Sequence, residues 1–337
     1  MNLEPIDPET AVELYLADRE TELRWATVKA HKSRLGHFVR WCDERDITNC
    51  NALTGRLLHE YRIWRRNEGD LAPATEKTQL DTLRVFVRWL GTIDGVHPDL
   101  HHKVRSPNIS DDENTRSVML DTEDAERMLA YLEKYEYATR THVVVALLWH
   151  TMLRRGAVRG LDLADYDRDE QFLAIVHRPD TDTPVKNGKS GERLVALSDR
   201  ICDLLDDYIR DRREDVTDEY SRKPLITTTH GRVSPATIAK DAYCYSRPCV
   251  TGADCPHGRD PESCEYMQSP GKAPKCPSSV SPHAYRRGGI THYLASDVPE
   301  TAVSQRANVS PDVLEQHYDQ RTKREKMEQR RQYLSNI

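Results

Sequence analysis

Amphipathic helical periodicity fills most of the first hundred residues, and it limits what this chain can fold into more than any other feature. In residues 25–45, WATVKAHKSRLGHFVRWCDER, the expected inward-facing side chains recur every three or four positions. Residues 11–20, 53–69 and 72–93 repeat this pattern, and four such helices predict a small bundle. The stripe expected on the helix at 25–45 comprises Val28, His31, Leu35, Phe38, Val39 and Cys42.

Local signals predict where these helices begin and end. Thr54 is the expected N-cap of one helix and Gly69 its expected C-cap, while Thr75 is the expected N-cap of the next. Residues 1–105 are therefore expected to form one helical domain. Residues 106–117, SPNISDDENTRS, are polar and acidic and are expected to form an interdomain linker. The buried stripe of the last helix is expected to comprise Leu80, Leu83, Val87 and Leu90.

A second domain is expected at 118–337, and it combines helices with short strands. Asp121 is a helix start signal, and the strongly apolar segment 141–153, THVVVALLWHTML, should lie at the centre of a core. Alternation in 161–179 and 185–198, with the turn residues Asn187-Gly188, predicts two or three strands in a hairpin. The remainder returns to helix, apart from one cysteine-rich segment. The expected fold class is mainly α with a small β-sheet.

The charge balance bears on the choice of partner. The chain carries 55 acidic and 49 basic residues, and a net charge of −6 ordinarily argues against a nucleic-acid partner. However, 36 Arg against 13 Lys and 31 Asp against 24 Glu is typical of proteins from salt-loving organisms, in which surface charge is screened. An ordinary acidic cytoplasmic protein is the alternative. The sequence has no long apolar run and no signal-peptide pattern, so a cytoplasmic location without a membrane partner is expected.

Basic side chains recur in the second domain ahead of a lone tyrosine. Arg154 follows the apolar helix, Lys186 lies in a turn between strands, and His283 and Arg286 lie three residues apart at a helix start, before Tyr318. Each alone has an ordinary explanation, such as a solvated or capping role. Together they suit attack on a phosphodiester, because arginines bind non-bridging oxygens, histidine can accept the phenol proton, and lysine can protonate the leaving alkoxide.

These motifs resemble, in order, those of the tyrosine recombinases, which include the phage-type and Xer-like integrases. The resemblance covers nearly the whole chain, from TMLRRGAVRG through PVKNGKSGERLVAL and PHAYRR to the tyrosine of EQHYD. It implies a SAM-like core-binding bundle and a catalytic domain in which Arg154, Lys186, His283 and Arg286 surround a DNA phosphate and Tyr318 attacks it. It also implies double-stranded DNA as partner, a homotetramer on DNA, and recombination or integration through a 3′-phosphotyrosyl link without a nucleotide or metal cofactor. The composition would make the chain a haloarchaeal member.

The chain departs from the family pattern at three positions. Met152 occupies the place of a glycine and Ala157 that of a glutamate. Nine residues before the tyrosine, where the family has a second histidine, lies Val309, which cannot donate a hydrogen bond through its side chain. The residues that could take over this role are Asn308, Gln305 and His317.

Alternative interpretations remain open from the sequence. Lys189 is the alternative to Lys186 as the catalytic lysine. Loss of the second histidine allows a catalytically impaired, recombinase-like DNA-binding protein. The same chemistry also allows a type IB topoisomerase-like enzyme that relaxes supercoils, although the bundle ahead of the catalytic domain disfavours it.

A cysteine-rich insertion at 244–280 directly precedes His283. Five of the eight cysteines fall within the 33 residues from 244 to 276, among many glycines and prolines. In a cytosolic chain this clustering favours a structural zinc ion over disulfides, although free or disulfide-bonded cysteines are the alternative. The expected ligands are Cys249, Cys255, Cys264 and Cys276, with His257 as a replacement for one.

The segment after the tyrosine, QRTKREKMEQRRQYL, carries six Arg or Lys against two Glu. A solvated helix face would explain this composition. In related recombinases the corresponding segment packs onto a neighbouring protomer, so an intersubunit role is also expected.

Overall fold

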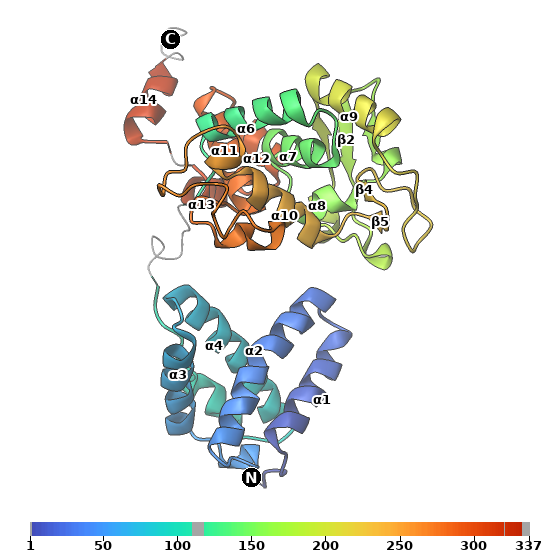
Figure 1. The fold of residues 1–337 in the computed structure, drawn as a ribbon. Helices are drawn as coiled ribbons and strands as arrows, with labels where there is room; N and C mark the ends of the chain where they lie inside the picture. The colour runs from blue at the N-terminus through green and yellow to red at the C-terminus, as the bar shows by residue number, and fades with distance from the viewer. Residues whose placement is uncertain (1, 110–117, 320, 332–337) are drawn as a thin grey trace. The chain divides into compact units, whose positions relative to one another are not determined.

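The structure, a computed structural model, describes residues 2–109, 118–319 and 321–331. The chain divides into two compact units, Met1–Arg116 and Ser117–Ile337 (Figure 1). Most of the linker expected at 106–117 lies outside the described residues. Within the described part, no helix is both long and apolar enough to cross a membrane.

The first unit is a helical bundle with an aromatic core. It comprises α1 (Pro8–Glu20), α2 (Trp25–Glu44), α3 (Gly55–Gly69) and α4 (Pro73–Thr92), with short 3₁₀ turns at Cys50–Ala52 and Pro98–Lys103. Phe38 packs edge-on against Tyr61 and Phe86, which joins α2 to α3 and α4. All four stripe residues expected on α4 are buried, whereas His31 and Val39 on α2 are only partly buried.

Two of the expected helix ends in this unit are wrong, and a third is right. Thr54 caps α3 as expected, because its Oγ1 accepts the Leu57 N–H at 3.3 Å. Gly69 is still helical, and the left-handed C-cap residue is Asp70, with φ 43°. Thr75 lies inside α4, which begins at Pro73. Proline is common at the first helical position because its ring fixes φ at a helical value and because a backbone N–H at that position would have no partner within the helix.

The second unit is built around α7 (Arg140–His150), the apolar segment that was expected at the centre of a core. Its residues Val143 to Trp149 are all buried, and α6, α9, α10 and α11 pack around it (Figure 1). The mainly α fold with small sheets is confirmed. The other helices are α6 (Thr122–Tyr135), α8 (Arg155–Gly160), α9 (Asp199–Asp211), α10 (Pro235–Tyr245), α11 (Pro282–Ala295), α12 (Glu300–Ala307), α13 (Pro311–His317) and α14 (Lys323–Arg331).

The strands form a three-stranded antiparallel sheet and a separate two-stranded one. The first has the order β1 (Tyr166–Asp167), β2 (Phe172–Ile175), β3 (Arg193–Ala196), and the second pairs β4 (Thr227–Thr228) with β5 (Gly231–Arg232). The turn predicted at Asn187-Gly188 exists, and both residues have positive φ. It does not form a tight turn between β2 and β3, because the two strands are joined by residues 176–192, and this turn is only one part of that segment.

Two glycines allow α11 to approach the residue Leu120, which precedes α6, and the end of α7 at backbone distance. A Cβ on Gly288 would lie 1.8 Å from the carbonyl oxygen of Leu120, and one on Gly289 would lie 2.6 Å from that of Trp149. Real Cβ atoms do not approach this closely, so any side chain here would force the helix outward. Since His283 and Arg286 lie on the same helix, these glycines fix the depth at which both enter the unit.

Candidate active site

A cleft of about 340 Å³ opens between the starts of α8 and α11 and the side of α10. Arg154, Arg155, His283 and Arg286 line it, together with Tyr243 of α10. The cleft therefore gathers side chains from segments more than a hundred residues apart in the sequence.

Arg154 is placed by a tight turn that follows α7. Thr151 caps α7, and its hydroxyl donates to the Leu147 carbonyl. The next residue, Met152, has φ 54°, a left-handed conformation that glycine adopts more readily, which accounts for the glycine of the family pattern. Met152 holds this conformation while fully buried, and Arg154 then becomes the N-cap residue of α8.

Arg286 is the most deeply buried cation of the cleft, with 1% of its surface exposed. Its Nη1 donates to the Met152 carbonyl at 2.5 Å and its Nη2 to the Ala307 carbonyl at 2.7 Å. Burial, followed by the nearby charge of Arg154, lowers the pKa of Arg286 to about 10. The guanidinium is therefore still charged at neutral pH, and two carbonyls fix its orientation.

Three arginines converge on the last carbonyls of α12. Arg193 donates through Nε to the Arg306 carbonyl at 2.8 Å, and Arg286 donates to the next carbonyl, that of Ala307. Both terminal nitrogens of Arg154 lie 3.4 Å from the carbonyl of Asn308, which follows. Helix C-termini carry unpaired carbonyls and partial negative charge, so this end of α12 offsets the repulsion among the three guanidinium groups.

Arg193 was missed by the sequence reasoning. It lies at the start of β3, and burial together with Arg286 and Arg154 lowers its pKa to about 10. A charged residue beginning a short alternating strand was the one available signal, and it is too common to identify a site residue.

The ring of Tyr318 lies against the same cluster. The Arg286 guanidinium carbon lies 5.4 Å from its centroid, and the His283 ring lies 5.7 Å away at 62°. Tyr318 ends α13 and is 6% exposed, and its carbonyl accepts the Thr291 hydroxyl at 2.8 Å. The phenol thus lies beside the two residues with which the sequence motifs associated it.

His283 is neutral at physiological pH. Burial, followed by the charges of Arg287, Arg286, Arg154 and Lys186, lowers its pKa to about 4. A neutral imidazole can accept a proton, as a general base must. The same interaction places Lys186 within electrostatic reach of the cleft, although its side chain is exposed on the turn. The structure thus brings together Arg154, Lys186, His283, Arg286 and Tyr318.

The side chains expected to bind a metal ion lie in the cysteine-rich insertion. Among the residues that the structure describes, no three His, Cys, Asp or Glu side chains are placed to hold a metal ion. His257, expected as a replacement ligand, forms a 2.8 Å hydrogen bond with Ser278 instead. Burial, followed by the neighbouring Cys255 and Cys276, raises the pKa of the Cys249 thiol, so these three thiols lie near one another.

The insertion is joined to α10 by a buried arginine. Arg247 donates to the Cys244 carbonyl at 3.0 Å and to the Tyr266 carbonyl at 2.7 Å. A second link runs from the Val280 N–H to the Ser246 hydroxyl at 2.9 Å. These bonds hold the chain on the approach to His283.

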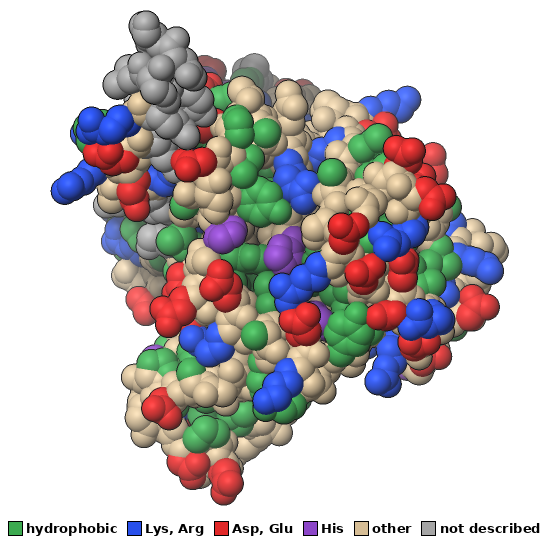
Figure 2. All heavy atoms as spheres, turned by 90° about the horizontal axis from the view of Figure 1, so that it is seen from above, with side chains coloured by type: hydrophobic (Ala, Val, Ile, Leu, Met, Phe, Trp, Pro, Cys, Tyr) green, Lys and Arg blue, Asp and Glu red, His purple; other side chains and the backbone are tan. Residues whose placement is uncertain are grey.

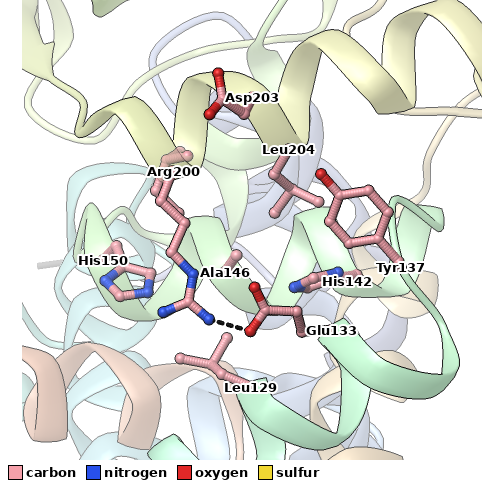
Figure 3. Close-up of a pocket in the computed structure, with 10 residues that line it drawn as sticks. Leu129, Glu133, Tyr137, His142, Ala146, His150, Arg200, Asp203 and Leu204 are labelled. Carbon is pink, nitrogen blue, oxygen red and sulfur yellow. Dashed lines mark hydrogen bonds and ion pairs between the residues drawn. The ribbon is translucent and has the colours of Figure 1, made fainter.

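A separate pocket of about 270 Å³ lies between α6, α7 and α9. Figure 3 shows His142 and His150 of α7 lining it, with Arg200 of α9 paired to Glu133 of α6. Burial lowers the pKa of each histidine to about 4. This pocket contains none of the five residues gathered at the cleft.

Comparisons with known proteins agree with this geometry. The sequence model described as "Phage integrase family" matches residues 119–241. The "Tyrosine recombinase XerC 2" of Ralstonia nicotianae is 27% identical over 229 residues, covering 65% of this chain and 62% of that protein. The chain thus spans less than two thirds of that relative's length.

Solved structures show the same fold. The Tn1549 transposon integrase, in complex with transposon right-end DNA, superposes with a TM-score of 0.64 at 13% identity, covering 98% of this chain and all of that one (100%). A lambda integrase dimer bound to a COC′ core site gives a TM-score of 0.59 at 10% identity, covering 97% of this chain and 78% of that one. Residues 119–241 thus match the phage integrase family, and nearly the whole chain shares its fold with these integrases.

Proposed function

We propose that this chain is a site-specific DNA recombinase that cuts and rejoins DNA through a 3′-phosphotyrosyl intermediate. The observation that carries the proposal is the position of the Tyr318 ring, which lies beside a buried, charged arginine and a neutral histidine. A phenol, a proton acceptor and fixed cations are the groups that phosphodiester transfer to tyrosine needs.

In the proposed reaction the Tyr318 oxygen attacks the scissile phosphorus and the bond to the 5′ oxygen breaks. His283 accepts the phenol proton, and Lys186 donates a proton to the leaving 5′ oxygen. Arg154 and Arg286 bind the non-bridging oxygens, and preorganised donors of this kind typically contribute about 3–4 kcal/mol each in the transition state. Attack by a second strand's 5′-hydroxyl on the phosphotyrosine reverses these steps. No nucleotide cofactor or metal ion is required.

The proposed partners are double-stranded DNA and further copies of the chain, assembled as a tetramer. A lambda integrase tetramer bound to a Holliday junction is among the structures with this fold, with a TM-score of 0.61. In this chain Asp319 anchors the residues after Tyr318, because it pairs with Arg321 at 2.6 Å and Lys326 at 3.0 Å. We propose that the basic helix α14, on which Met327 is half exposed, contacts a neighbouring protomer.

Two further proposals concern the setting and the insertion. The excess of Asp and Arg supports action in the cytoplasm of a salt-loving, haloarchaeal organism. The clustering of the cysteines, and the closeness of Cys249 to Cys255 and Cys276, supports a structural zinc ion in the insertion. Metal analysis of protein purified without chelator tests the second proposal, and protein free of zinc that is fully folded would refute it.

Covalent trapping on a nicked suicide substrate tests the main proposal. The expected result is a protein–DNA adduct whose peptide map locates the DNA on Tyr318. Tyr318→Phe removes the nucleophile and should form no adduct while still binding DNA. An adduct formed by Tyr318→Phe, or mapped to another residue, would overturn the assignment.

Two further assays separate the alternatives. Relaxation of supercoiled plasmid without two-site recombination would indicate a type IB topoisomerase-like enzyme. DNA binding with no adduct from the unaltered chain would indicate a recombinase-like binding protein.

A further inference from the structure

Position 309, where the family has its second histidine, contributes only packing in this chain. The Val309 side chain is buried in an apolar cluster with Met152, Leu314 and Tyr318. Its N–H donates to the Ser304 carbonyl at 3.0 Å, and its carbonyl accepts the Ser304 hydroxyl at 2.5 Å. Neither its side chain nor its backbone is available to a substrate.

The preceding residue, Asn308, is placed differently. It ends α12 in the left-handed conformation, with φ 50°, and its carbonyl lies 3.4 Å from both terminal nitrogens of Arg154. Its side-chain Nδ2 is buried and has no hydrogen-bond partner in the described part of the chain. A buried donor without an acceptor is costly and rare in native proteins, so this amide calls for an explanation.

The Asn308 amide lies against the turn that carries Lys186. A Cβ built on Gly191 would lie 3.2 Å from Asn308 Nδ2 and 2.5 Å from the Lys186 carbonyl oxygen. Asn308 Nδ2 and the Lys186 carbonyl oxygen therefore both lie near the position that a Cβ of residue 191 would occupy. Residue 191 must be small for the turn to approach Asn308, and a modest shift of the turn would let Nδ2 donate to the Lys186 carbonyl.

We propose that Asn308 is a positioning residue that docks the Lys186 turn when DNA is bound, by donating its side-chain amide to the Lys186 carbonyl. Its own carbonyl meanwhile lies against Arg154, so that one residue links the phosphate-binding arginine to the lysine that protonates the leaving group. This inference rests on the proposed function, since it assigns Asn308 a role through Lys186. Gln305, the exposed amide one turn earlier on α12, has no such position.

Asn308→Gly is the appropriate variant. Glycine adopts φ 50° without strain, so the change removes the amide and leaves the backbone conformation intact. The matched control is Gln305→Ala, which removes an exposed carboxamide from the same helix. Circular dichroism and DNA binding check that both variants are folded.

The readout uses a DNA substrate whose scissile 5′ oxygen is replaced by sulfur. A thiolate leaves without protonation, so a defect that acts through the general acid disappears on this substrate. We expect Asn308→Gly to lose about 10- to 100-fold in cleavage rate on ordinary DNA, as for a displaced catalytic group, and to recover to near the unaltered rate on the sulfur substrate. Lys186→Ala should recover in the same way, whereas Arg154→Ala should not.

Two results would overturn the inference: an Asn308→Gly rate equal to that of Gln305→Ala on ordinary DNA, or a defect that persists on the sulfur substrate. The second would instead indicate donation to the phosphate itself. If the unaltered chain cleaves neither substrate, the proposed function fails. In that case the inference is tested separately by amide hydrogen exchange of residues 186–192 in the protein bound to DNA. Faster exchange in Asn308→Gly than in the unaltered chain supports docking of the turn, and unchanged exchange refutes it.

Discussion

Arg286 illustrates how much a single side chain can depend on backbone that is distant in sequence. Its two terminal nitrogens are shared between the carbonyls of Met152 and Ala307, which belong to the turn after α7 and to the end of α12. A guanidinium can serve both because its donors diverge within one plane. Arg286 therefore holds two elements together while it presents charge to the cleft.

Replacing Arg286 with lysine should separate geometry from charge. The ammonium keeps the charge but cannot reproduce the planar fork, so we expect DNA cleavage to fall about 100- to 1,000-fold, as for loss of one oxyanion donor. One buried carbonyl would also lose its partner, which should lower the free energy of unfolding by about 1–3 kcal/mol. Single-turnover cleavage and urea denaturation measure the two effects. Arg155→Lys, on the exposed rim of the same cleft, is the control, and an equal loss there would contradict the argument.

Among the elements, α11 shows how helix packing depth sets the site. Gly288→Ala would place a Cβ 1.8 Å from the Leu120 carbonyl, so α11 must move, and overpacking of this kind typically costs about 1–3 kcal/mol. His283 and Arg286 would move with the helix, so cleavage should fall as well. Gly36→Ala in α2 is the matched control, because no atom lies within 4 Å of its added Cβ. It should be neutral or stabilising by up to about 1 kcal/mol, and denaturation of both variants checks the contrast.

The two histidines of α7 make stability depend on pH. His142 and His150 are buried and neutral in the folded chain, with pKa values lowered to about 4, whereas an unfolded histidine titrates near 6.5. Below pH 6.5 the unfolded state therefore binds more protons, and the free energy of unfolding falls as pH drops towards 4. We expect a loss of up to about 6 kcal/mol over this range from the pair, about 3 kcal/mol from each histidine.

Urea denaturation between pH 7 and pH 4 measures this loss. His142→Gln should reduce the slope, because a neutral amide does not titrate, while the exposed His230→Gln should not. A slope that is the same in all three proteins would show that α7 is not its origin.

Local elements could be predicted from this sequence, but the relations between them could not. The stripe of α4, the Thr54 cap and the central position of α7 follow from spacing and apolar content alone. The convergence of Arg154, Arg193 and Arg286 on the end of α12 has no local signal, because each contact joins segments distant along the chain. Methionine itself gives no indication of the left-handed conformation of residue 152; only the glycine of the resembled family pattern at this position hints at it.

At the scale of the whole molecule, charge is the dominant property. Carboxylates and basic side chains are interspersed over the face shown in Figure 2. Some ion pairs are buried, as where Asp162 contacts Arg232 at 2.5 Å and Arg222 at 2.8 Å. Salt screens exposed charges far more than buried ones, so these pairs should persist in concentrated salt while the exposed pairs contribute little in any medium.

This distribution predicts how the protein responds to salt. The net charge of −6 destabilises the compact state through repulsion between like charges, and molar KCl screens that repulsion. Molar KCl also weakens the exposed ion pairs, but each of these contributes only about 0–1 kcal/mol. We therefore expect the midpoint of thermal unfolding to rise between 0.1 and about 2 M KCl. Counterion release will weaken DNA binding over the same range, so cleavage must be measured at saturating protein. A protein adapted to salt keeps its cleavage activity there, whereas unfolding at lower temperature and loss of cleavage in molar KCl would identify an ordinary acidic protein.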